Sequence, residues 1–417
     1  MPRQRLSGDF WKFWTGQTIS NLGSSFTFLA LPLLVFQLTG SAVNLAITTA
    51  AYFIPYLLFG LVIGAWVDRV DRKRLMILVD LGRAAVIASI PALAAVDALS
   101  VEWVYAVSFL TATLTIAFDS SEFAAVPSLV DRSDLVTANG RIQASYQAAQ
   151  LVGPILAGGL LGAGLPIEDV LLVDAASFVV SAVALVTVRG SFNAPDDPDR
   201  EPTSLRRDVA DGLRYVLGHP VLRNISIMMA MFNFVGATTI AQLVLFAKER
   251  LDASDSQVGL LFSAGSAGIV VLSLLAGRIR RKLSFSVAAL GALMLYGALT
   301  FVFAWMEVYW LALPLWALIS GLGLFFNINT ISLRQEIVPS HMLGRVVSIA
   351  GVLAWSAIPL GALLGGYAIE ATGDVALVYA AIGVLTFLIA FSFRFTALGH
   401  AEDYIEERAE PVPQPAQ

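Results

Sequence analysis

Residues 64–74 read Gly64-Ala-Trp-Val-Asp68-Arg69-Val-Asp71-Arg72-Lys73-Arg74, a run that begins apolar and ends almost wholly charged. Apolar stretches at 43–67 and 74–95 flank it, and each is long enough to cross a bilayer, which takes roughly 20 residues. A charged run between two such stretches predicts a loop at a membrane surface that joins two spanning helices. Its basic residues predict that this surface faces the cytoplasm.

The same alternation of long apolar stretches and short charged clusters fills the rest of the chain. Of the 417 residues, 57% are hydrophobic and 14% are charged, whereas soluble proteins carry roughly 25% charged residues. No single soluble core could bury so much apolar surface, so lipid must surround much of it. The sequence predicts an all-α integral membrane protein with twelve transmembrane helices, at 13–37, 43–67, 74–95, 102–121, 140–163, 169–188, 222–247, 257–277, 284–304, 309–333, 345–368 and 375–395.

A polar stretch at 190–221 divides these helices into two sets of six. It contains Pro195, Asp196 and Pro198, so it is expected to be a cytoplasmic linker, with a short surface helix near 205–217. The two sets resemble each other, because Val126-Pro127-Ser128 returns as Val338-Pro339-Ser340. We therefore expect two pseudo-symmetric six-helix bundles. The predicted regions are an N-terminal bundle at 1–189, the linker at 190–221, a C-terminal bundle at 222–395 and a cytoplasmic tail at 396–417.

Basic residues are distributed unevenly between the predicted loops. With a cytoplasmic N-terminus, the inner loops hold the clusters at 69–74 and 278–282, whereas the outer loops hold only Lys248 and Arg250. Cytoplasmic loops of membrane proteins are enriched in Lys and Arg. The sequence therefore predicts a multi-pass protein of the cell (inner) membrane with both termini in the cytoplasm and the lipid bilayer as a partner.

The loop at 64–74 resembles the signature of the major facilitator superfamily of membrane transporters. The matching residues are Gly64, Asp68, Arg69, Arg72 and Lys73. Asp71 stands where that family usually has a second glycine. The resemblance implies a cytoplasmic gate in which Asp68 docks on the start of the eleventh helix, at Gly344-Arg345. An ordinary loop with inward-facing positive charge is the alternative interpretation.

The fifth predicted helix carries a pattern of glycine and proline that resembles the antiporter motif of drug exporters in the same superfamily. Its residues are Gly153, Pro154, Gly158 and Gly159. Proline kinks a helix, and glycine lets a neighbouring helix approach closely. This helix is therefore expected to be one at which the two bundles rock. Plain packing of small residues at a helix crossing is the equally weighted alternative.

Longer stretches resemble the macrolide-efflux and enterobactin-exporter branch of that superfamily, namely 118–139, 335–345 and the opening at 21–41. The resemblance implies the major facilitator fold and alternating access. It also implies export of a bulky, largely apolar drug-like compound or siderophore, coupled to proton entry. Within transporters, a lysophospholipid or other lipid transporter is the alternative. From a different class, a membrane enzyme or a non-transporting receptor is the alternative.

Several functional classes lack the residues they need. The sequence has no nucleotide-binding G-x-x-x-x-G-K-[ST] loop and no cysteine, and its three histidines, His219, His341 and His400, fall in predicted loops or the tail. An ATP-driven pump, an enzyme and a metal site are therefore not expected. Nor do we expect a cofactor or a nucleic-acid partner. We expect a monomer that acts on a small-molecule substrate.

Polar side chains inside the predicted helices are the remaining candidates for function, since each is unfavourable in lipid unless it is paired or faces water. Candidates for a central cavity are Gln17, Asn21, Ser24, Gln143, Gln147, Gln150, Asn233, Thr239 and Asn327. Hydrogen bonding between helices is the alternative role for each of them.

Four acids are candidates for carrying protons, namely Asp119, Glu122, Asp80 and Asp174. Asp80 lies three residues before Arg83 and is expected to pair with it. Asp119 and Glu122 lie toward the cytoplasmic end of the fourth helix, within reach of the gate cations, where a structural gate role competes with proton carriage. Asp174 is interpreted as an ordinary carboxylate near the outer end of the sixth helix.

Overall fold

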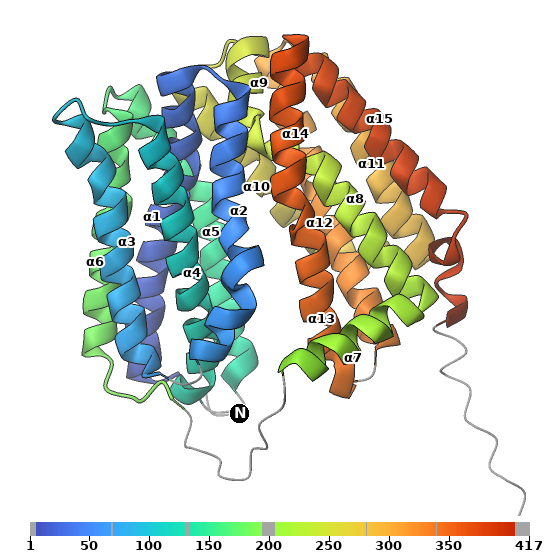
Figure 1. Cartoon of the computed structure of the whole chain (residues 1–417), viewed down its shortest axis with the longest axis horizontal. Coiled ribbons are helices and arrows are strands. Elements are labelled where there is room, and N and C mark those ends of the chain that lie inside the picture. Colours follow the sequence, from blue (N-terminus) through green and yellow to red (C-terminus); the bar gives the residue numbers. More distant parts are fainter. Residues whose placement is uncertain are drawn as a thin grey trace, which may run out of the picture. The chain divides into compact units, whose positions relative to one another are not determined.

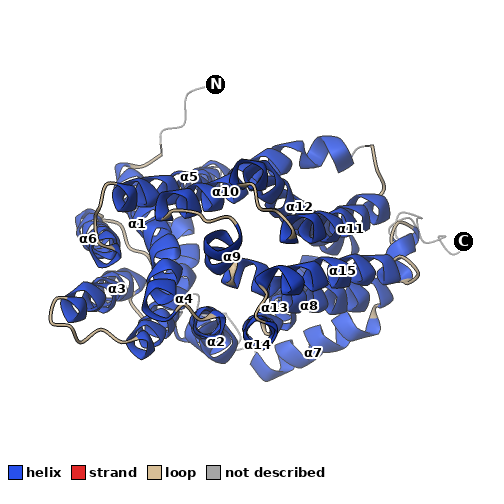
Figure 2. Cartoon of the chain, turned by 90° about the horizontal axis from the view of Figure 1, so that it is seen from above, coloured by secondary structure: helices blue, strands red, loops and turns tan. Residues whose placement is uncertain are grey.

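The computed structural model describes residues 6–67, 70–130, 134–193, 205–280, 282–338 and 340–404, and within them it contains helices and connecting loops but no strand (Figures 1 and 2). The helices group into two compact units. The first unit consists of residues 1–200 with 241–266, and the second of residues 201–240 with 267–417.

The first unit contains α1 (Gly8–Thr39), α2 (Ala42–Val67), α3 (Arg72–Ala94), α4 (Val101–Leu129), α5 (Leu135–Gly162), α6 (Ile167–Thr187), α9 (Leu243–Arg250) and the beginning of α10 (Asp255–Arg280). α1 packs against α5 and α6, and α3 packs against α4 and α6. The side chain of Ser7 caps α1 by accepting the Phe10 N–H at 3.0 Å. Phe10 then joins Phe13 and Phe118 in a buried core cluster of this unit.

The second unit contains α7 (Leu205–Gly218), α8 (Pro220–Ala241), the end of α10, α11 (Phe285–Ala304), α12 (Tyr309–Ile337), α13 (Ser340–Trp355), α14 (Ala357–Thr372), α15 (Val375–Phe393) and a 3-10 turn at Ala397–His400. The surface helix expected near 205–217 is confirmed as α7, which packs on α13 and buries Val216 completely. Gly297 and Gly383 allow α11 and α15 to meet backbone to backbone.

Among the described residues, eleven helical segments are long and apolar enough to cross a membrane. α5 is not one of them, although its 28 residues extend for about 42 Å. Its first half carries Asn139, Arg141, Gln143 and Gln147, which make it too polar. It is the twelfth long helix of the chain, and the predicted all-α membrane fold is confirmed.

Two of the predicted spans are interrupted. The stretch 222–247 forms α8 and α9, with the break at Gln242, whose side chain donates to the Ala42 carbonyl at 2.7 Å. The stretch 345–368 forms α13 and α14, with the break at Ser356. Pro359 lies three residues after Ser356. Because proline has no N–H, it cannot donate the helical hydrogen bond to the preceding turn, which explains the second break.

Candidate functional site

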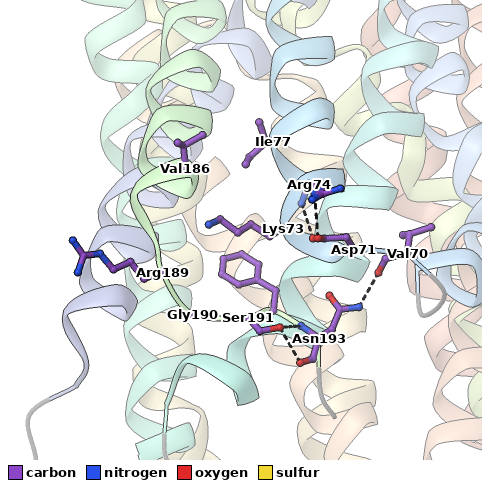
Figure 3. A pocket seen from close by; sticks show the side chains of 11 residues that line it. Val70, Asp71, Lys73, Arg74, Ile77, Val186, Arg189, Gly190, Ser191 and Asn193 are labelled. Atoms are coloured by element: carbon purple, nitrogen blue, oxygen red, sulfur yellow. Dashed lines mark hydrogen bonds and ion pairs between the residues drawn. The ribbon is translucent and has the colours of Figure 1, made fainter. Parts of the chain in front are cut away.

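The turn between α2 and α3, at the centre of the predicted gate, is held from both sides (Figure 3). Asp71 caps α3 by accepting the Arg74 N–H at 3.0 Å. Asn193, just after α6, donates its amide to the Val70 carbonyl at 2.8 Å and accepts the Arg72 N–H at 3.1 Å. Because φ of Asp71 is −67°, this turn does not require the glycine usual in the family.

Two cations of the predicted gate bind backbone carbonyls near the end of α6. The buried Arg72 donates to the Phe192 carbonyl at 3.3 Å, and the Lys73 ammonium donates to the Val188 carbonyl. Together with Asn193, these bonds attach the beginning of α3 to the segment that follows α6. Sequence reasoning missed Asn193, because a single asparagine far along the chain shows no pattern of its own.

The remaining gate residues fall outside the part of the chain that can be described. Asp68 and Arg69 lie in the gap at 68–69, and nothing is described of the side chains of Gly64 and Arg345. The docking of Asp68 on the eleventh helix therefore stays a prediction. The helix that contains Arg345 begins earlier than expected, at Ser340.

An ion pair lies inside the first unit at membrane depth. Asp80 and Arg83 of α3 form the predicted pair, and their side chains are almost completely buried. The Arg83 guanidinium also lies 4.3 Å from the ring centres of Phe118 and Phe178, an arrangement that stabilises a cation out of water. Asp80 Oδ2 still lacks a hydrogen-bond partner. A buried pair with an unsatisfied oxygen is rare in membrane segments and is a mark of function.

Arg83 interacts with more than one carboxylate. Besides its ion pair with Asp80, it acts electrostatically on Asp119 and Glu122 of α4 and on Asp174 of α6. One guanidinium is therefore within electrostatic range of four acids from three helices and bonds to one of them, Asp80; we call these five residues the Arg83 cluster. Among the described residues, the cation that acts on Asp119 and Glu122 is thus one in the interior of α3, and an influence of the gate cations on them stays a prediction.

The surroundings of the two α4 acids differ. The Asp119 side chain is exposed, whereas Glu122 is half-buried and its Oε1 is buried without a hydrogen-bond partner. The two residues are three apart and therefore lie on one face of the helix.

Asp174 is not a helix-end carboxylate, and this expectation is wrong. It lies two turns inside α6 with 1% of its surface exposed. Its carboxylate accepts hydrogen bonds from the hydroxyls of Thr27 (2.5 Å), Ser24 (3.3 Å) and Ser177 (3.2 Å). Thr27 was missed, although its spacing of three residues from Ser24 places both hydroxyls on one face of α1.

Several of the cavity candidates make hydrogen bonds between helices. Gln17 donates to Ser181 at 3.0 Å, and Asn233 donates to the Ala354 carbonyl at 2.9 Å. Thr239 is buried and lies 3.4 Å from the Tyr296 hydroxyl. These three fit the alternative role, and Ser24 binds Asp174. The candidates that are half-buried or exposed, for which a cavity role stays a prediction, are Asn21, Gln143, Gln147, Gln150 and Asn327.

The glycines of α5 lie against two different helices. A Cβ on Gly153 would come within 1.6 Å of the Ser25 hydroxyl of α1, and one on Gly158 within 3.2 Å of the Ser256 backbone of α10. The Ser256 hydroxyl donates to the Gly158 carbonyl at 2.8 Å. Gly159, in contrast, has open space around it. Gly153 and Gly158 thus permit close helix contacts, and Pro154 lies inside a continuous α5.

In the second unit, the corresponding glycines lie against α8. A Cβ on Gly361 would come within 1.8 Å of the Phe234 carbonyl oxygen, and one on Gly365 within 1.8 Å of the Thr238 hydroxyl. Thr238 donates to the Gly361 carbonyl at 3.1 Å. Asn233 satisfies the Ala354 carbonyl next to the break between α13 and α14. α8 thus supports the interrupted helix on both sides of its break.

The second unit also buries a cation that sequence reasoning missed. Arg334 of α12 is 6% exposed and donates to the Met229 thioether at 3.4 Å. Within the described chain it has no carboxylate partner. Its position near the end of an apolar helix was the available signal, because an arginine there is unusual.

Known proteins resemble this chain over most of its length. The family model for the Major Facilitator Superfamily matches residues 13–359. The multidrug efflux pump Tap of Mycolicibacterium fortuitum is 30% identical over 367 residues, which cover 84% of this chain and 87% of the relative. Macrolide efflux protein A of Streptococcus pyogenes is 24% identical over 357 residues, or 85% of this chain and 88% of the relative.

Solved structures agree on the fold. The nucleoside transporter NupG has a TM-score of 0.75 at 13% identity and covers 94% of this chain and 99% of its own. A bacterial homologue of the iron transporter ferroportin has a TM-score of 0.71 at 18% identity, with 94% and 100% covered. With most of its length matched by the family model and its fold shared with these transporters, the chain belongs to the major facilitator superfamily.

Proposed function

We propose that the protein is a secondary-active exporter of bulky, largely apolar small molecules, that it works by alternating access, and that proton entry drives it. Two relatives that match over more than four fifths of this chain are named for multidrug and macrolide efflux, which supports export of drug-like compounds. In this proposal the protein acts as a monomer in the cell membrane, with both termini in the cytoplasm.

The Arg83 cluster is the observation that carries the proposed coupling. A coupling site must bind a proton in one conformation and release it in another. Four carboxylates around one guanidinium leave acids in excess of cations, so proton binding can change the charge of the cluster. The acids come from α3, α4 and α6, so a shift between these helices changes which acid pairs with Arg83.

Within the cluster, Glu122 is the favoured proton carrier. Asp174 accepts three hydroxyl hydrogen bonds and Asp80 is paired with Arg83. Glu122 has a buried Oε1 without a partner, so a proton can occupy that oxygen without displacing a donor. Asp119, three residues earlier and more exposed, is the second candidate on this face of α4.

The test is transport into everted membrane vesicles in response to an imposed pH gradient. Wild-type protein should concentrate substrate, and an uncoupler should abolish this. Glu122→Gln should lower accumulation to the level seen with the uncoupler while downhill flux continues. Glu102→Gln is a matched control, because it makes the same change on the same helix at an exposed position, and it should transport normally.

Two outcomes would change the proposal. Accumulation by Glu122→Gln at the wild-type level would show that this acid is structural and would move the search to Asp119.

The substrate panel should contain a macrolide, a cationic dye, a siderophore and a lysophospholipid. Transport of the lysophospholipid alone would replace drug export with lipid transport.

A further inference from the structure

A cavity of about 760 Å³ lies where α3 begins and α6 ends, and the proposed transport cycle does not use it (Figure 3). Its walls include the cations Lys73, Arg74 and Arg189 and the apolar side chains of Ile77 and Val186. The cavity lies entirely within the first unit. Its position at the ends of two spanning helices places it at a boundary of the membrane.

The cations of this cavity have donors to spare. The Lys73 side chain extends toward the end of α6, where its ammonium donates to the Val188 carbonyl; an ammonium has three donors, so two remain. The Arg189 side chain is exposed and makes no hydrogen bond or ion pair within the described chain. Arg74 is held only by an exposed pair with Asp71 at 3.4 Å, a weak interaction. The three cations outnumber the one carboxylate of the lining, Asp71, so the cavity attracts an anion.

The apolar side chains continue the cavity along the helices. Ile77 lies one turn inside α3 from Lys73, and Val186, in the last turn of α6, is 61% exposed. The cations stand at the helix ends and the apolar groups on the spanning parts. A phospholipid has the same order of chemistry, with a phosphate at the membrane boundary and acyl chains in the hydrocarbon. Basic pockets between transmembrane helices are sites of this kind.

We propose that this cavity binds an anionic phospholipid, with the phosphate between Lys73 and Arg189 and an acyl chain along Ile77 and Val186. A free phosphate would satisfy the cations but would leave the apolar wall uncovered, so the lipid is the occupant. Because Lys73 and Asn193 also attach the beginning of α3 to the segment after α6, the bound lipid strengthens the contact that holds the gate turn.

The test uses purified full-length protein in nanodiscs of phosphatidylcholine that contain increasing amounts of phosphatidylglycerol, with bound lipid counted by native mass spectrometry. Replacing both cations, in Lys73→Gln with Arg189→Gln, should weaken phosphatidylglycerol binding by about 30-fold, as expected for two cations near an anionic headgroup. The matched control removes two exposed cations elsewhere, in Arg278→Gln with Lys282→Gln, and should leave this binding unchanged.

Three results would overturn the proposal. Equal weakening by the control pair would mean general attraction to the membrane. Displacement of the lipid by inorganic phosphate at millimolar concentration would mean a site for free anions. If the double variant does not fold, Arg189→Gln alone decides, since its exposed side chain supports no packing; it should weaken binding by about 5-fold, and wild-type affinity would overturn the site.

Discussion

The two units are built from the same kind of helices, but they differ in how they hold charge. In the first unit, Asp80, Arg83 and Asp174 are buried, and Arg83 pairs with Asp80 and acts electrostatically on Asp174. In the second unit, the only buried Asp, Glu, Lys or Arg side chain in the described residues is Arg334, and its neighbour is the thioether of Met229. The charged chemistry of this transporter is therefore concentrated in its first unit.

The second unit has close backbone contacts where the first has charges. Gly361 brings α14 against the Phe234 carbonyl, and Asn233 donates to the Ala354 carbonyl beside the helix break. The glycine pattern of α5 recurs here, yet α5 is continuous and this helix is interrupted. The comparison teaches that the internal repeat extends to the packing of small residues but not to ionisable ones. The proposed function assigns proton coupling to the first unit, whereas the break between α13 and α14 lies in the second.

The largest expected effect is on stability, from breaking the ion pair of the first unit. Arg83→Gln leaves Asp80 buried without its cation, and removing one partner of a buried pair costs roughly 3 kcal/mol or more. The free energy of unfolding of the purified protein in detergent measures this. Adding Asp80→Asn to Arg83→Gln should restore part of the loss, because no isolated charge then remains in the interior.

The second unit provides the comparison for that variant. Arg334 has no carboxylate to leave unpaired, so Arg334→Met should change the free energy of unfolding by less than about 1 kcal/mol, since exchanging a buried charge for an apolar group is often neutral or stabilising. A loss as large as that of Arg83→Gln would show that both units depend on buried charge, and the contrast between them would fail.

The sequence alone was sufficient for contacts that are local along the chain. The Asp80–Arg83 pair follows from a spacing of three residues on one helix, and the helices follow from the lengths of the apolar stretches. Asp174 was misread because its partners Thr27 and Ser24 lie about 150 residues earlier. A pattern within one helix cannot show which other helix will supply hydroxyl donors to a carboxylate.

The helix breaks show the same limit. Pro359 was visible in the sequence, but a proline inside an apolar stretch predicts a kink and not the separation into α13 and α14. Asn233 supports the break by donating its amide to the Ala354 carbonyl, two residues before Ser356. Asn193 likewise bonds to the Val70 carbonyl and the Arg72 N–H, which belong to a turn more than a hundred residues earlier in the chain. Both asparagines owe their roles to tertiary packing, which periodicity does not encode.

An intermediate effect is expected at the repeated glycines. In Gly361→Ala the new methyl group meets the Phe234 backbone carbonyl, which cannot rotate away, so a loss of about 2 kcal/mol in the free energy of unfolding is expected. In Gly153→Ala it meets the Ser25 hydroxyl, which can turn aside, and the Ser25 Cβ at 2.5 Å, but no α1 backbone atom comes closer than 3.6 Å, so the loss should be smaller. Gly159→Ala has open space and serves as the control. A larger loss in Gly153→Ala than in Gly361→Ala would contradict the assignment of tight backbone contact to the second unit.

The smallest expected effect concerns Glu402, which lies outside the spanning helices. Among the described carboxylates of the second unit, it is the one whose pKa is shifted. Glu402 follows the last helix and binds the first turn of α11: its Oε1 accepts the Ser286 N–H at 3.0 Å, and the Ser286 hydroxyl lies 2.8 Å from Oε2. Burial raises the pKa of Glu402, but the hydrogen bonds from Ser286 outweigh this and hold the pKa below its usual value of 4.5.

A lowered pKa in the folded state fixes the sign of the pH dependence. The stabilisation by Glu402 is present above pH 4.5, where the unfolded chain is also ionised, and is lost as the pH falls through the folded pKa. Wild-type protein should therefore lose slightly more stability than Glu402→Gln between pH 7 and pH 3.5. Because the carboxylate is only partly buried, the difference should stay within about 0.5 kcal/mol.

Thermal unfolding between pH 7 and pH 3.5 measures this difference. Asp403→Asn is the control, because Asp403 is an exposed neighbour on the same segment. If Glu402→Gln follows the wild-type pH profile, the contact between the C-terminal segment and α11 contributes no charge-dependent stability. In that event the contrast between the second unit and the Arg83 cluster would become sharper.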